Sequence, residues 1–391
     1  MTQPLKVAML IQGYLPRIGG AERQLAALAP LLRERGVEIH IITRRYPGLS
    51  AFELIDGVPV HRLPIPGPKA LASLAYTVTA VPLLLRLRPH LIHAHELLSP
   101  TTTAVLSKRI LGIPVVTKLL RGGVLGDLAK LKKKPGGLRR LDTFRQQVDA
   151  FITISREIDD ELADVDIPAS RRVFIPNGVD TNRFQPATTA EKKALCQRLN
   201  LPQGPLVIFT GRLSPEKRID DVISVWPAIK QAHSDAALVI VGSGDEATRL
   251  ETMGGDSVHF MGRIEDVAPY LRCADIFILP SETEGLSNAL LEAMACGLAS
   301  VVTTVGGATD LIAHQQSGWL IPAHAPEAIQ AALNTLLDDE QMCRQLGQQA
   351  RKRIMAEYTL ERTADRLRQL YDAVLHRHVA DLTASSLGVE S

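Results

Sequence analysis

The apolar positions of the chain form short runs that alternate with longer segments of helical period. In the first half these runs lie at residues 5–11, 38–43, 58–63, 91–94, 114–117 and 150–154. The pattern restarts in the second half, with runs at residues 206–210, 237–241, 257–261, 276–279 and 300–303. Short runs separated by helix-length segments predict the strands of a parallel sheet that helices cover on both faces. The sequence therefore predicts an α/β protein with two doubly wound, Rossmann-like domains.

A turn-rich segment, IPNGVDTNRFQP (residues 175–186), separates the two series of predicted strands. Such a segment is typical of a domain junction. We place the first domain at residues 1–183, the second at 184–360 and a terminal segment at 361–391. Apolar residues recur at helical spacing from Leu360 to Val374, so we expect a helix there. The last ten residues, LTASSLGVES, have little to bury and are expected to be disordered.

Charge is unevenly distributed, although the net charge is only +2. Residues 1–145 hold 22 Lys/Arg against 8 Asp/Glu, and residues 146–391 hold 22 against 34. A basic first half suits an anionic partner or a membrane surface. Nucleic acid is not expected as a partner, because aromatic residues make up only 4% of the chain and do not interleave with basic ones.

Cysteine spacing and apolar stretches bear on the compartment. The four cysteines lack CxxC spacing, which favours buried, reduced thiols over disulfides or a zinc site. The apolar run at residues 7–11 is too short for a signal peptide. Residues 70–85 are more apolar but contain Ser, Thr and Pro, so we expect a buried helix there, with a membrane-surface helix as the alternative. These features predict a cytoplasmic protein, and the charge adds possible peripheral association with the inner face of the membrane.

The loops after the predicted strands carry the candidate chemistry, because such sheets bind ligands outside the carboxyl ends of their strands. Gly19 and Gly20 precede a helix whose free N–H groups suit a phosphate, although a simple turn would look the same. Arg212 and Lys217 follow another strand and either bind an anion or form a solvated basic turn. The segment LIHAHE ends a strand with two histidines, for which no third metal ligand is identifiable and which need do no more than pack.

The stretch SETEGLSNALLEAMACG (residues 281–297) combines a loop acid with an acid inside an apolar helix. Ser287 is a plausible N-cap, and the N–H groups of Gly285, Leu286 and Ser287 suit a pyrophosphate. Glu284 can accept hydrogen bonds from ligand hydroxyls. Glu292 lies roughly 10 Å further along the helix, a span comparable with that from a sugar ring across a diphosphate to a ribose. The alternative for Glu292 is an acid on the solvated face of the helix.

Taken together, these loops resemble the retaining glycosyltransferases of family 4, which have the GT-B fold. GGAERQ, LIHAHE, IPNGVDTNRF, GRLSPEK and EGLSNALLEAMACG occur in the family's order, and Glu284 and Glu292 match its E-x7-E signature. The resemblance implies two Rossmann-like domains on either side of a cleft and a C-terminal helix that returns to the first domain. It also implies a nucleotide-sugar donor held mainly by the second domain.

The resemblance also implies roles for individual residues. Arg212 and Lys217 match the basic pair on the donor diphosphate, Glu284 matches the acid that holds the donor sugar, and His95 matches the histidine beside that sugar. These four are the expected catalytic residues. Glu292 matches the ribose ligand, and the remaining expected donor contacts are Gly19, Gly20, Arg263, Ile264, Gly285, Leu286 and Ser287.

We therefore expect retaining transfer of a hexose-type sugar from a nucleotide-sugar, UDP-linked rather than GDP-linked, to a lipid carrier, a glycan or a small metabolite. We identify no DxD motif of the metal-dependent kind, so we expect neither a metal nor a cofactor. The alternatives are a sugar- or nucleotide-binding protein without transfer activity and an epimerase of the same fold. The basic segment 121–145 is expected to be mobile, with Leu125, Leu128 and Leu131 entering a bilayer surface, unless it is only a solvated loop.

Overall fold

The computed structural model describes residues 4–17 and 19–386 and divides the chain into two compact units. One unit contains the chain up to Asn177 and the segment from Leu360, and the other spans Gly178–Thr359. The junction therefore lies at 177/178 rather than at the expected 183/184. The reason is that Val179 N–H donates to Tyr358 O at 2.9 Å and Arg351 donates to Thr181 O at 3.1 Å, which attaches this segment to the second unit.

The first unit is built on an eight-stranded sheet with the order β3-β4-β2-β1-β5-β6-β7-β8. Its strands are β1 (Leu5–Leu10), β2 (Val37–Arg44), β3 (Phe52–Ile55), β4 (Val58–Leu63), β5 (Leu91–His95), β6 (Val115–Lys118), β7 (Ala150–Thr153) and β8 (Arg172–Phe174). All pairs are parallel except β3 with β4. The six strands expected from the apolar runs are confirmed. The short edge strands β3 and β8, which are only partly buried, carry no such run and were not expected.

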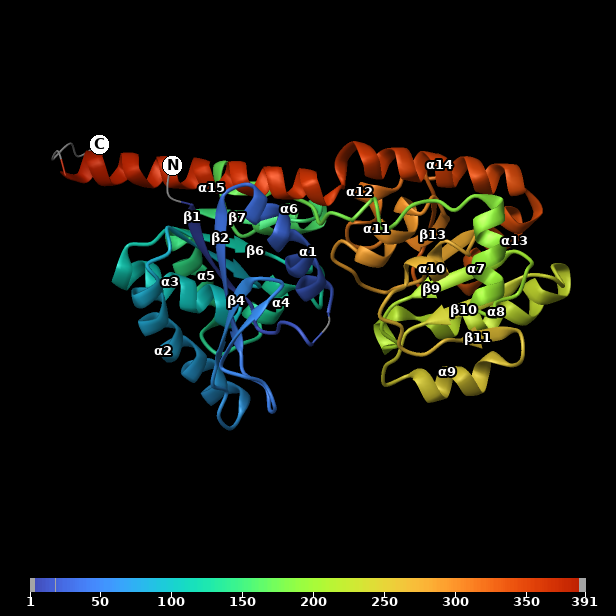
Figure 1. Ribbon diagram of the computed structural model, residues 1–391, viewed down its shortest axis with the longest axis horizontal. Coiled ribbons are helices and arrows are strands. Elements are labelled where there is room, and N and C mark those ends of the chain that lie inside the picture. Colours follow the sequence, from blue (N-terminus) through green and yellow to red (C-terminus); the bar gives the residue numbers. More distant parts are fainter. Residues whose placement is uncertain (1–3, 18, 387–391) are drawn as a thin grey trace. The chain divides into compact units, whose positions relative to one another are not determined.

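Helices lie on both faces of this sheet. They are α1 (Gly20–Glu34), α2 (Lys69–Leu87), α3 (Ser99–Leu111), α4 (Asp127–Lys132), α5 (Gly137–Gln147), α6 (Arg156–Ala163) and α15 (Leu360–Ser386), with the short η1 (Ala169–Arg171). The expected return of the C-terminal helix to the first unit is confirmed, because α15 packs against α1 (Figure 1). Leu367, Tyr371 and Val374 of α15 join the hydrophobic core beside the strands. The helix continues to Ser386, so the expected disorder is wrong for residues 382–386, and residues 387–391 lie outside the described part.

The second unit contains a fully parallel six-stranded sheet with the order β11-β10-β9-β12-β13-β14. Its strands are β9 (Leu206–Thr210), β10 (Ala237–Val241), β11 (Val258–Phe260), β12 (Ile276–Leu279), β13 (Ala299–Thr303) and β14 (Trp319–Ile321). The helices are α7 (Thr189–Arg198), α8 (Ile219–Ala232), α9 (Ala247–Gly254), α10 (Ala268–Leu271), α11 (Asn288–Ala295), α12 (Ala308–Leu311), α13 (Pro326–Asp338) and α14 (Glu340–Glu357), with the short η2 (Pro215–Lys217). The sheet confirms the second doubly wound domain.

Two local expectations for the first unit are wrong. The segment 121–145 is folded into α4 and α5 rather than left as a loop, and Leu128 and Leu131 are 3% and 0% exposed. These two leucines serve the core and cannot enter a bilayer. The helix over residues 70–85 is not a buried one either. In the described part of the chain, Ala70–Leu87 alone is long and apolar enough to cross a membrane, a test that core helices also pass, yet only 28% of it is buried.

Candidate functional site

The loops that follow the strands of the second unit are joined by backbone hydrogen bonds. Leu213 N–H donates to Ser243 O at 3.0 Å, which connects the loops after β9 and β10. Gly242 N–H donates to Gly262 O at 2.8 Å, which adds the loop after β11. The loop after β12 contacts η2, because Glu282 N–H donates to Glu216 O at 2.9 Å. The loop after β13 contacts the loop after β12, because Gly307 N–H donates to Gly285 O at 2.7 Å. The carboxyl edge of the sheet is therefore one connected set of loops.

Two glycines make the closest of these approaches possible. A Cβ on Gly242 would lie 1.8 Å from Gly211 O, and a Cβ on Gly244 would lie 2.1 Å from Leu213 O. No side chain fits at either position, so the Gly-x-Gly turn after β10 packs against the backbone that carries Arg212. The structure therefore gives this turn a packing role.

Lys217 and Glu284 meet at this edge although 67 positions separate them in the chain. Lys217 Nζ lies 2.5 Å from Glu284 Oε1, and the Ser281 hydroxyl donates to the same oxygen at 2.7 Å. The two charged side chains are 15% and 10% exposed. A largely desolvated ion pair of this kind holds both groups in place, since each would be costly to bury alone.

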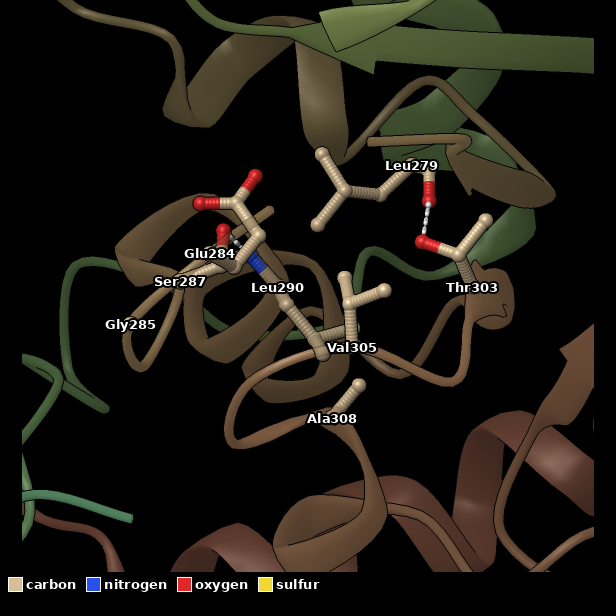
Figure 2. A pocket seen from close by; sticks show the side chains of 8 residues that line it. All are labelled: Leu279, Glu284, Gly285, Ser287, Leu290, Thr303, Val305 and Ala308. Atoms are coloured by element: carbon tan, nitrogen blue, oxygen red, sulfur yellow. Dashed lines mark hydrogen bonds between the residues drawn. The ribbon is translucent and has the colours of Figure 1, made fainter. Parts of the chain in front are cut away.

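A pocket opens beside this pair, between the loops after β12 and β13 (Figure 2). Its lining combines apolar side chains with the Glu284 carboxylate and two hydroxyls, and consists of Leu279, Glu284, Gly285, Ser287, Leu290, Thr303, Val305 and Ala308. Thr303 donates to Ser281 O at 2.6 Å, which connects β13 to the loop that carries Glu284. The pocket's empty volume of about 210 Å³ is below the roughly 300–1,000 Å³ of most ligand pockets, so it can hold only part of a nucleotide-sugar.

Val305 and the two glycines that follow it also contribute to the site and were not among the expected residues. A Cβ on Gly306, whose φ is +55°, would lie 2.6 Å from both Glu284 O and Gly285 O. This glycine lets the loop after β13 pack directly on the loop after β12. The signal was present in the sequence, since Gly306 and Gly307 follow a predicted strand as Gly19 and Gly20 do.

Helix α11 begins at the pocket. The expected N-cap is confirmed, because the Ser287 hydroxyl accepts from Leu290 N–H at 3.4 Å (Figure 2). Gly285 and Leu286 are buried at this end, where the helix dipole favours negative charge. Glu292 lies within α11 and is partly buried, whereas its neighbours Leu291 and Ala293 are fully buried. The two glutamates therefore sit respectively before the helix and inside it.

Arg212 differs from Lys217. Its side chain is exposed, and no hydrogen bond or ion pair to another described residue is found for its guanidinium. It follows β9 by two residues, on the loop held by Leu213 and Ser243. Arg263 is exposed and Ile264 partly buried, directly after Gly262 at the same edge. The expected donor-side residues thus lie on neighbouring loops of one sheet edge, and their roles remain predictions.

The remaining expected residues lie in the first unit. Gly19 is the N-cap of α1, and a Cβ there would lie 2.4 Å from Glu22 Oε2, so the Glu22 carboxylate packs on this turn. The N-terminal end of a helix carries partial positive charge, so the Glu22 carboxylate lies where a phosphate would otherwise be favoured. Gly20 opens the helix.

His95 is 6% exposed at the end of β5 and stacks on His93, with ring centroids 4.3 Å apart. Burial, with the nearby Lys118 charge, lowers the pKa of His95 to about 3, and burial lowers the pKa of His93 as well. Both rings are therefore neutral at pH 7. His93 Nδ1 lies 2.7 Å from the Tyr371 hydroxyl of α15, which fixes the inner ring of the stack. No group of three His, Cys, Asp or Glu side chains able to hold a metal occurs among the residues that the structure describes.

The expected state of the cysteines is confirmed. Cys196, Cys273, Cys296 and Cys343 are free and buried. Burial raises the pKa of the Cys273, Cys296 and Cys343 thiols to about 12, so they are not reactive thiolates.

Family models match both units. The model of Glycosyltransferase Family 4 matches residues 18–183, and the model of glycosyl transferases group 1 matches residues 192–353. The chain belongs to glycosyltransferase family 4. It is a retaining, nucleotide-sugar-dependent glycosyltransferase with the GT-B fold, as the motifs indicated. A binding protein without transfer activity and an epimerase are thereby set aside.

The similar proteins described next align with nearly the whole chain. A GDP-mannose-dependent alpha-mannosyltransferase of Mycolicibacterium smegmatis is 29% identical, over 95% of this chain and 98% of its own length. An N-acetyl-alpha-D-glucosaminyl L-malate synthase of Bacillus anthracis is 28% identical, over 92% and 95%. The solved structure of a sucrose-phosphate synthase from Thermosynechococcus elongatus superposes with a TM-score of 0.81 at 22% identity, covering 95% of this chain and 99% of that one, which shows the shared fold.

Proposed function

We propose that this glycosyltransferase moves a hexose from a nucleoside diphosphate hexose to its acceptor without a metal ion. The observation that carries the proposal is the Lys217–Glu284 pair beside the pocket at the start of α11. A cation, a carboxylate and a helix N-terminus thus lie on one sheet edge. The cation and the helix N-terminus suit a diphosphate, and the carboxylate suits sugar hydroxyls. The diphosphate binds Lys217, Arg212 and the N–H groups at the start of α11, while the hexose hydroxyls donate to Glu284.

The proposed chemistry follows from where charge develops. The bond between the anomeric carbon and the donor phosphate oxygen breaks, and a bond from the acceptor oxygen to the anomeric carbon forms on the same face. The acceptor proton passes to the departing phosphate oxygen, so neither a carboxylate nucleophile nor a glutamate base takes part. The leaving diphosphate gains negative charge as the sugar becomes oxocarbenium-like. Lys217, which Glu284 already orients, stabilises that charge, and Arg212 adds a second cation from the same loop.

Lys217 and Arg212 then take the place of a divalent cation. Lys217 is already oriented by Glu284, which limits the entropy lost when a phosphate binds. Arg212 is exposed and offers a planar fork that suits two phosphate oxygens. Metal independence therefore rests on two basic groups from one loop. His95, Gly19 and Gly20 of the first unit keep the roles that the family resemblance implies.

The donor base and sugar are the finer part of the proposal. A UDP-sugar rather than a GDP-sugar was expected from the sequence, but the Mycolicibacterium relative is named for GDP-mannose. Thermal-shift measurements against UDP-, GDP-, ADP- and TDP-sugars separate these donors, followed by an assay of nucleoside diphosphate release. A clear stabilisation by one nucleotide family, with acceptor-dependent release of its diphosphate, is the expected result. Stabilisation by none of them would contradict the proposed site.

A further inference from the structure

Helix α2 is apolar on both of its faces. Toward the interior, Ala72, Tyr76, Ala80 and Leu84 are buried at four-residue spacing. On the opposite side, the fractional exposures of Leu71, Leu74, Val78 and Leu85 are 50%, 60%, 59% and 57%. No charged residue occurs between Ala70 and Leu85. The outer face of a helix on a protein surface is normally polar, so this one lacks the side chains that water favours.

The exposed apolar surface continues onto two neighbouring helices of the same layer. Helix α2 packs against α3, and α3 packs against α5 (Figure 1). Leu106 and Ile110 of α3 are 39% and 58% exposed, and Leu138 of α5 is 63% exposed. Several exposed apolar side chains gathered on adjacent helices mark an interaction surface, whereas single ones do not. We call this surface the α2–α3–α5 face.

The same layer is strongly basic. Residues 69–145 hold 14 Lys/Arg and only 3 Asp/Glu. Of these acids Asp127 is buried and Glu96 partly buried, so Asp142 is the exposed one. Exposed basic residues flank the apolar side chains at the helix ends and connections, among them Arg86, Arg88, Arg109, Lys132, Lys133, Lys134 and Arg139. The partner of this face must therefore be apolar and negatively charged.

We propose that the α2–α3–α5 face binds the surface of an anionic lipid bilayer. The exposed leucines, Val78 and Ile110 enter the boundary between headgroups and acyl chains, and the surrounding Lys and Arg side chains contact lipid phosphates. Helix α2 lies along the interface and does not span it, because its inner face belongs to the folded unit. Tyr76 is fully buried and donates to Ile42 O at 2.9 Å, and Ala80 and Leu84 are also fully buried.

A second copy of the chain fits this face less well than a bilayer does. Pairing the α2–α3–α5 face with itself would bring two basic surfaces together, and like charges held close repel. An anionic bilayer supplies both properties that the face lacks in water. An acceptor carried on that surface would then lie close to the enzyme; this consequence rests on the proposed transfer function, whereas lipid binding itself does not.

The test is flotation of the full-length protein with vesicles of phosphatidylcholine alone or with about one-third phosphatidylglycerol, at low and high salt. The wild type is expected to float with the anionic vesicles at low salt. It is not expected to float with vesicles of phosphatidylcholine alone. The triple variant Leu74→Gln, Val78→Gln, Leu85→Gln should reduce the bound fraction at least tenfold. These positions are exposed, so its melting temperature and nucleoside diphosphate affinity should stay unchanged.

The matched control is Met253→Gln with Met355→Gln, two exposed apolar residues of the second unit at 43% and 45% exposure, which should float as the wild type does. A second variant, Lys132→Glu with Lys133→Glu and Lys134→Glu, should also lose binding to anionic vesicles. The proposal fails if the wild type does not float with anionic vesicles, or if the glutamine variant floats equally well. A wild-type dimer that the glutamine variant converts to a monomer, without flotation of either, would assign the face to self-association instead. If the wild type does not float but still transfers sugar to a soluble acceptor, the lipid-binding proposal fails while the proposed function stands.

Discussion

Lys217 Nζ lies 2.5 Å from Glu284 Oε1 at the carboxyl edge of the second unit's sheet. Neither residue needs the other for its local structure, since Lys217 ends η2 and Glu284 lies in the loop after β12. The pairing orients the ammonium, and the Ser281 hydroxyl donates to the same carboxylate oxygen. One contact thereby couples the group proposed for the diphosphate to the group proposed for the sugar.

The first prediction separates the two glutamates. Glu292→Gln should weaken binding of the free nucleoside diphosphate by about 1.5–3 kcal/mol, the scale of a hydrogen bond to a charged group. Glu284→Gln should leave that affinity near the wild-type value and lower kcat, because the amide oxygen still accepts from Lys217. Isothermal titration with the diphosphate and steady-state kinetics measure the two effects. Equal loss of diphosphate affinity in both variants would contradict this division of roles.

The second prediction concerns the leaving group. Arg212→Ala should lower kcat by about 10²-fold or more, the cost of removing one preorganised donor. The wild type should keep its activity in excess EDTA, since Lys217 and Arg212 carry the charge. Arg263→Ala is a control from a neighbouring loop and should affect binding of the nucleotide more than kcat. Inactivation by EDTA that magnesium or manganese reverses would show that a metal carries the charge.

The third prediction concerns the glycine turn after β10. Gly244→Ala should displace the Leu213 backbone, because the added Cβ would lie 2.1 Å from Leu213 O. Since Arg212 precedes Leu213, nucleoside diphosphate affinity should fall, and stability should drop by about 1–3 kcal/mol as for other overpacked sites. Gly112→Ala is the matched control, with a positive φ of 71° but no atom within 4 Å of the added Cβ. It should cost about 1 kcal/mol in stability and leave diphosphate affinity unchanged. Normal binding by the Gly244 variant would refute the proposed packing role.

The fourth prediction is a pH dependence of stability in the first unit. Burial raises the pKa of Asp127 to about 7, although Leu120 N–H donates to its Oδ2 at 2.8 Å. The folded state therefore binds more protons than the unfolded state between about pH 4 and pH 7, and the stability from this group is lost as pH rises through that window. Asp127→Asn removes the dependence, so it should gain about 2–4 kcal/mol relative to the wild type between pH 4.5 and pH 8.

Urea denaturation of both proteins at the two pH values measures this gain. Asp142→Asn is the control, since that side chain is 62% exposed and should follow the wild-type profile. Parallel stability profiles for wild type and Asp127→Asn would show that Asp127 is ionised at little cost.

The sequence by itself determined the two sheets and the family. Strands buried on both faces are mostly apolar, so β9, β10 and β12 could be located from their apolar runs alone. The Ser287 cap was also readable, because a cap bond joins residues three apart in the chain. The motif order in the loops identified the glycosyltransferase family before any contact was known. These are local properties, and local sequence encodes them.

The tertiary structure alone decided which side chains meet and which remain exposed. Lys217 reaches Glu284, and His93 reaches Tyr371 across 278 positions, because the folded sheets bring distant segments together. Periodicity could not show that Leu128 and Leu131 are buried while Leu74 and Val78 are exposed. An apolar face has the same pattern whether it packs on protein or meets another phase. Whether an apolar face is buried depends on which elements pack against it, and only the tertiary structure shows those contacts.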